Sequence, residues 1–85
     1  MFEKLLKNWF NIKNQAELNI ATVLGSPIEC CDERGVYYIE EIFFDEDGDL
    51  CGWCMDVDGG EFELPGVFLS REDETKIINW LTNHA

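Results

Sequence analysis

Carboxylates and thiols crowd one segment of the chain, residues 43–63, which reads FFDEDGDLCGWCMDVDGGEFE. Within it, Asp45, Asp47 and Asp49 alternate as the first oxygen ligands of an EF-hand calcium loop do. The position that requires glycine in such a loop is Leu50, however, and the position of the bidentate glutamate is Asp56. Because the flanking residues alternate as strands do, the sequence predicts a hairpin turn rather than a calcium site.

The four cysteines offer a second kind of chemistry. Cys51 and Cys54 have the C-x-x-C spacing of redox and metal-binding pairs, but they lie in a segment with strand periodicity, where residues three apart point to opposite faces. The surrounding carboxylates raise a thiol pKa instead of lowering it. Adjacent Cys30 and Cys31 diverge in the same way, so we expect free thiols packed as small apolar groups, with no metal and no cofactor. A small structural zinc module that uses all four cysteines is the alternative.

Catalysis has little support. The single histidine, His84, lies next to the C-terminus, and the chain has neither a G-x-S-x-G motif nor a glycine-rich loop that could hold a phosphate. A nucleophile would therefore lack a base. The sequence predicts that the protein is not an enzyme.

Charge is the strongest feature of the composition. The chain holds 18 acidic and 6 basic residues, a net charge of −12. Residues 29–63 carry thirteen carboxylates against one base, Arg34, whereas residues 1–14 carry three lysines against Glu3, a net of 3 − 1 = +2. Repulsion within such a cluster destabilises the fold, which suggests a role beyond solubility. The like charge also excludes nucleic acid as a direct partner.

Aromatic residues interleave with these acids, which is typical of a protein-binding surface. We therefore expect a non-enzymatic module that inhibits a basic, nucleic-acid-handling protein (a nuclease, a restriction or CRISPR-type effector, or a polymerase) by mimicking phosphates. Tyr37 or Tyr38 would be the aromatic anchor. The expected partner-binding acids are Glu40, Glu41, Asp45, Glu46, Asp47, Asp49, Asp56, Asp58, Glu61 and Glu63. A toxin-neutralising immunity protein and a housekeeping subunit with a merely solvated acidic surface are the alternatives.

These residues require a scaffold, which the hydrophobic pattern predicts to be one α+β domain over residues 1–85. An amphipathic helix is expected over residues 1–14 and a second helix over residues 71–83. Between them, residues 16–69 are expected to form an antiparallel meander of four or five strands, which can be strongly bent. The alternation of residues 16–25 predicts the first strand. No apolar run of ~18 residues and no secretory signal are present, so a cytoplasmic protein without a membrane span is expected.

Overall fold

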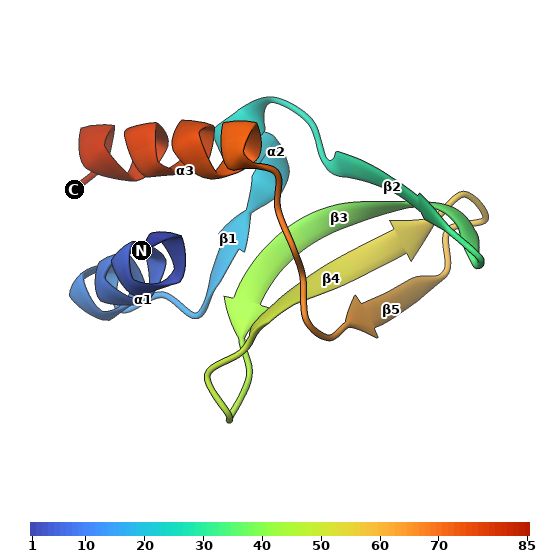
Figure 1. Cartoon of the computed structure of the whole chain (residues 1–85), viewed down its shortest axis with the longest axis horizontal. Coiled ribbons are helices and arrows are strands. Elements are labelled where there is room, and N and C mark those ends of the chain that lie inside the picture. The colour runs from blue at the N-terminus through green and yellow to red at the C-terminus, as the bar shows by residue number, and fades with distance from the viewer.

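The computed structural model describes residues 1–85 and combines three helices with a five-stranded antiparallel sheet (Figure 1), which confirms the α+β class. In chain order the elements are α1 (Phe2–Lys13), β1 (Glu17–Asn19), α2 (Ile20–Leu24), β2 (Ile28–Asp32), β3 (Gly35–Phe44), β4 (Leu50–Asp56), β5 (Glu61–Leu64) and α3 (Arg71–Asn83). The two long helices, α1 and α3, therefore open and close the chain, as the periodicity predicts.

Strand β3 is the centre of the sheet. It pairs with β1 and β2 along one side and with β4 along the other, and β5 follows at the far edge. A bulge between Ile39 and Glu41 adds one residue, Glu40, to β3. As a result Ile39 and Ile42, three positions apart, both point into the core, where they are 2% and 0% exposed. Such a bulge bends a strand and increases its twist, which gives the sheet its curvature.

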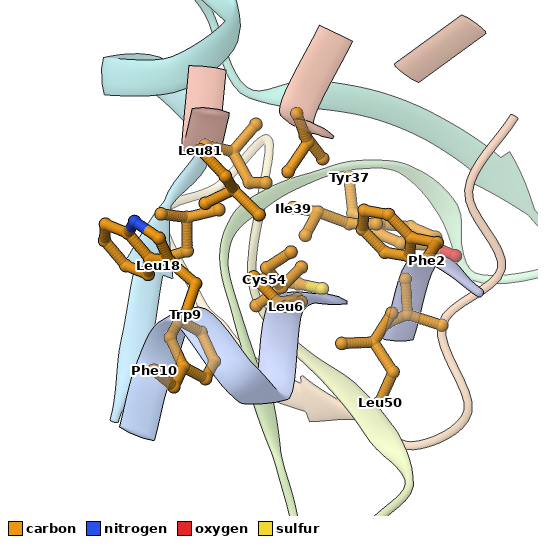
Figure 2. Close-up of a cluster of buried hydrophobic side chains, with 14 residues drawn as sticks. Phe2, Leu6, Trp9, Phe10, Leu18, Tyr37, Ile39, Leu50, Cys54 and Leu81 are labelled. Carbon is orange, nitrogen blue, oxygen red and sulfur yellow. The ribbon is translucent and has the colours of Figure 1, made fainter. Parts of the chain in front are cut away.

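The core lies between one face of this sheet and the two long helices (Figure 2). Helix α1 contributes Phe2, Leu6, Trp9 and Phe10, which recur at helical spacing. Helix α3 is capped at its N-terminus by Ser70, whose hydroxyl accepts the Asp73 backbone N–H at 3.1 Å. Three acidic residues in its first turn lie where the helix dipole favours negative charge.

The expectation of one strand over residues 16–25 is wrong beyond Asn19. The Asn19 side chain accepts the Thr22 backbone N–H at 2.9 Å and caps a short helix, α2, which ends at Gly25 with a φ of +92°. This turn of helix carries Ile20 into the core, where its side chain is fully buried. The sheet is also shorter at its other end than the expected range of 16–69, because its last strand, β5, ends at Leu64, before Pro65.

Candidate protein-binding face

One face of the sheet is not covered by the core. Because side chains alternate along a strand, β3 and β4 direct half of their residues away from the helices. Four large side chains on that side are half-buried, and none belongs to the hydrophobic core: Tyr38, Phe43, Trp53 and Met55. Five glutamates share the same side: Glu17, Glu29, Glu41, Glu61 and Glu63. We call the surface formed by these nine residues the open face.

The strand register arranges the open face in rows. In one row Glu41 lies opposite Trp53, which lies opposite Glu63. In the next row, running from β2 to β5, the order is Glu29, Tyr38, Met55 and Glu61. Neighbouring strands are ~4.8 Å apart, so the row of four strands spans ~14 Å and the row of three strands ~10 Å. Apolar side chains therefore occupy the middle of the face, and carboxylates flank them.

The charge of the open face is not neutralised within the chain. None of the five strands contains a lysine or an arginine. The two salt bridges, Arg34–Asp32 and Lys76–Glu72, lie elsewhere. Partial burial, followed by the nearby Glu17 carboxylate, raises the pKa of Glu41 above its ordinary value. The face is thus a source of unpaired negative charge, crowded enough to affect its own ionisation.

Comparisons with protein-family models, with curated proteins and with solved structures found no match for this chain. None of its helices has the length and apolar character that crossing a bilayer requires.

The predicted partner-binding acids do not form a single surface. Glu41, Glu61 and Glu63 belong to the open face, and Glu40 is the extra residue of the β3 bulge. The others lie in two turns: Asp45, Glu46, Asp47 and Asp49 between β3 and β4, and Asp56 and Asp58 where β4 passes into β5. These turns are at opposite ends of β4 (Figure 1), which at seven residues separates them by ~20 Å.

Two of these aspartates hold the turns together. Oδ1 of Asp45 accepts the backbone N–H groups of Asp47 and Asp49 at 3.0 and 2.9 Å. Oδ1 of Asp56 does the same in the β4–β5 turn, where it accepts the backbone N–H groups of Asp58 and Gly60 at 2.9 and 2.8 Å. Carboxylate oxygens of Asp45, Asp47 and Asp49 come within 4.8 Å of one another. Antiparallel pairing of β3 with β4 on either side of this segment confirms the predicted hairpin turn itself.

Removing the Asp45 side chain is expected to loosen the β3–β4 turn. The hydrogen bonds from backbone N–H groups, above all the one from Asp49, lower the pKa of the Asp45 carboxyl below its ordinary value of 3.8. Stability from the ionised carboxylate is therefore present above pH 3.8 and is lost as the pH falls through the lower, folded pKa. Asp45→Ala should melt at a lower temperature than Asp45→Asn at pH 7, because asparagine keeps an acceptor oxygen. Equal melting temperatures for both variants and the wild type would contradict this role.

The two adjacent tyrosines point in opposite directions. Tyr37 is 6% exposed and packs edge-on against Phe62 with ring centroids 5.3 Å apart, and its hydroxyl donates to Asp32 at 3.1 Å. Its ring is therefore unavailable as the expected anchor. Tyr38 lies on the open face and is the remaining candidate for the expected anchor.

Sequence reasoning missed two acids and one apolar residue of this surface. Glu17 and Glu29 come from β1 and β2, far from the acidic segment in sequence, and antiparallel pairing with β3 brings them to the face. The missed apolar member is Met55, whereas Phe43 and Trp53 are among the aromatic residues that interleave with the acids in the sequence. The two-residue periodicity of β4 was the available signal, since it separates Trp53 and Met55 from the buried positions on either side.

The thiols do not form a common ligand set. Cys51 and Cys54 are both fully buried, but only Cys54 belongs to the core, as expected for residues on opposite faces. Burial raises the pKa of Cys54 to about 11, and burial, followed by Asp45, raises that of Cys51. All four cysteines are free, and no three cysteine or histidine side chains converge. The expectation of packed thiols is wrong for Cys31, which is exposed on the edge strand β2. This geometry does not favour the zinc-module alternative.

A cleft of about 640 Å³ lies where α1, α3 and β1 meet, and Trp9, Trp80 and His84 line part of it. The His84 ring stacks on Trp80 with centroids 3.9 Å apart, and its Nδ1 is 2.8 Å from the Trp80 carbonyl oxygen. The cleft's one hydroxyl side chain, Thr22, donates to the Asn19 side chain at 3.1 Å. The cleft thus does not pair a nucleophile with a base.

Proposed function

We propose that this protein is a non-enzymatic binding module that inhibits a basic, nucleic-acid-handling protein, such as a nuclease, a restriction or CRISPR-type effector, or a polymerase. One observation supports this above the others: aromatic side chains and unpaired glutamates share the one sheet face that the helices leave open.

The open face has the composition that such a partner requires. An apolar centre that loses water on contact supplies most of the affinity of a protein interface, and a charged rim gives specificity and speed. Glu61 and Glu63 lie two apart on β5 and so present two carboxylates ~6.7 Å apart, about twice the ~3.4 Å rise between successive phosphates of one DNA strand. A basic groove that normally holds nucleic acid would be attracted to both features.

The acidic turns would act at longer range. Glu46, Asp47 and Asp49 at one end of β4, and Asp58 at the other, are exposed and extend the negative field beyond the open face. Exposed charges of this kind accelerate encounter and are screened by salt within ~8 Å at physiological ionic strength. The turns would thus affect the association rate, and the open face the lifetime of the complex.

The test begins with capture of the partner from a lysate at low salt, elution with a salt ramp and purification of the captured protein. We expect the affinity to fall steeply with salt, and duplex DNA to compete with this chain for the partner, because both would occupy one basic site. Simultaneous binding of DNA and this chain would overturn phosphate mimicry. A captured partner that binds no nucleic acid would favour the toxin-neutralising alternative, and salt-independent binding would identify the acids as a solvated surface.

A further inference from the structure

The open face contains a hollow at its β1 end. Its volume is about 370 Å³, and it is lined by Ala16, Glu17, Glu41, Phe43, Phe44 and Trp53. The register explains this composition, because Glu17 lies opposite Phe43 and Glu41 lies opposite Trp53. Three adjacent strands, β1, β3 and β4, thereby bring two carboxyl groups and aromatic rings around one space.

The groups around the hollow have no cationic partner within the chain. Neither Glu17 nor Glu41 forms a salt bridge. The Trp53 indole N–H donates to Glu61 Oε1 at 3.4 Å, which ties the indole to the neighbouring strand β5. The nearest lysine along the chain, Lys13, lines the cleft at the helix ends, which Glu17 and Glu41 also line, but it forms no salt bridge with either and does not line this hollow. The hollow is therefore negative, partly apolar and unfilled by the protein's own side chains.

A cation with a flat face suits these walls best. A guanidinium group can donate to two carboxylates at once and can stack on an aromatic ring, whereas an ammonium is a compact and strongly hydrated charge. Burial, followed by the Glu17 carboxylate, raises the pKa of Glu41, and a cation between the two carboxyl groups would relieve their mutual repulsion. Charge and shape thus favour arginine over lysine.

We infer that the hollow receives an arginine side chain of the basic partner, with its guanidinium between Glu17 and Glu41 and against the rings of Phe43 and Trp53. This inference rests on the proposed function and names the residue type that anchors the partner on the open face.

Calorimetric titration with hexa-arginine and hexa-lysine, two peptides of equal charge, tests this site. We expect the wild type to bind hexa-arginine about fivefold more tightly, the preference that stacking on an aromatic ring can give. Glu41→Gln and Trp53→Leu should each reduce the ratio to about one. The control Asp47→Asn removes a charge from the β3–β4 turn and should keep the preference. The Trp53 indole N–H signal in NMR spectra should shift more with hexa-arginine than with hexa-lysine.

Equal affinities for the two peptides, or a preference that survives in both Glu41→Gln and Trp53→Leu, would overturn the arginine site. Near-ultraviolet circular dichroism of the two variants shows whether their packing is native, and Trp53→Phe, which keeps a ring, should retain part of the preference. The proposed function is tested separately by DNA competition for the captured partner. The arginine site can therefore fail while the proposed function stands.

Discussion

Changing Glu41, Glu61 and Glu63 together to glutamine is expected to weaken binding of the basic partner by about 100-fold. Glu41 is half-buried and Glu61 and Glu63 are exposed. A carboxylate in such a charge pair contributes up to about 1 kcal/mol, and about 1.4 kcal/mol corresponds to a factor of ten in affinity. The fold should be retained or slightly stabilised, because the change removes repulsion among neighbouring acids. Titration calorimetry with the captured partner measures the affinity, and thermal unfolding measures the stability.

The matched control removes three charges from the β3–β4 turn: Glu46→Gln, Asp47→Asn and Asp49→Asn. Asp45 is left intact because its carboxylate holds the turn. We expect this control to lose less than about tenfold in affinity, mainly through slower association. Equal losses in the two triple variants would show that the partner senses net charge alone, and unchanged binding in both would assign the acids to solubility.

Replacing Gly52 with valine is expected to destabilise the fold by about 3 kcal/mol, the upper range for inserting atoms into a packed core. A Cβ atom at this position would lie 2.9 Å from Val67 Cγ2 and 3.2 Å from Ile39 Cγ2, and both neighbours are buried. The glycine of the CGWC motif therefore serves close packing of β4 beneath the segment that follows β5. Urea unfolding should show a lower midpoint with an unchanged slope.

Met55→Val is the control for Gly52→Val, since it alters a half-buried side chain of the same strand on the open face. Its effect should stay within about 1 kcal/mol, because the site has room to adjust. A Gly52→Val protein as stable as the wild type would mean that the segment around Val67 moves aside without loss of packing.

Much of the fold could be predicted because its signals are local. Periodicity defines α1, and periodicity together with a serine cap defines α3. Asp/Gly pairs define the two turns that flank β4. Helix α2 could not be recognised by periodicity, since five residues are too few to distinguish a helical from an alternating pattern. The local signals were the Asn19 cap and the glycine at the C-terminal end of the helix, Gly25.

The candidate site was harder to predict because it depends on register. Tyr37 and Tyr38 are adjacent in a strand that is apolar on both sides, so the sequence does not indicate which of them points inward. The bulge at Glu40 then changes the alternation for the second half of β3. Glu17 and Glu29 reach the open face only through pairing between distant segments, which no local pattern encodes.

The grouping of aromatic rings and glutamates on the open face also governs how the molecule meets its own copies. Two chains that approach with these faces together would bring ten glutamates into one interface, because each face carries five and no base. Like charges desolvated against each other are strongly unfavourable, so the exposed rings are protected from self-association without being covered. The surface can thus keep its apolar centre without pairing with a second copy, whereas a cationic surface would meet no such barrier.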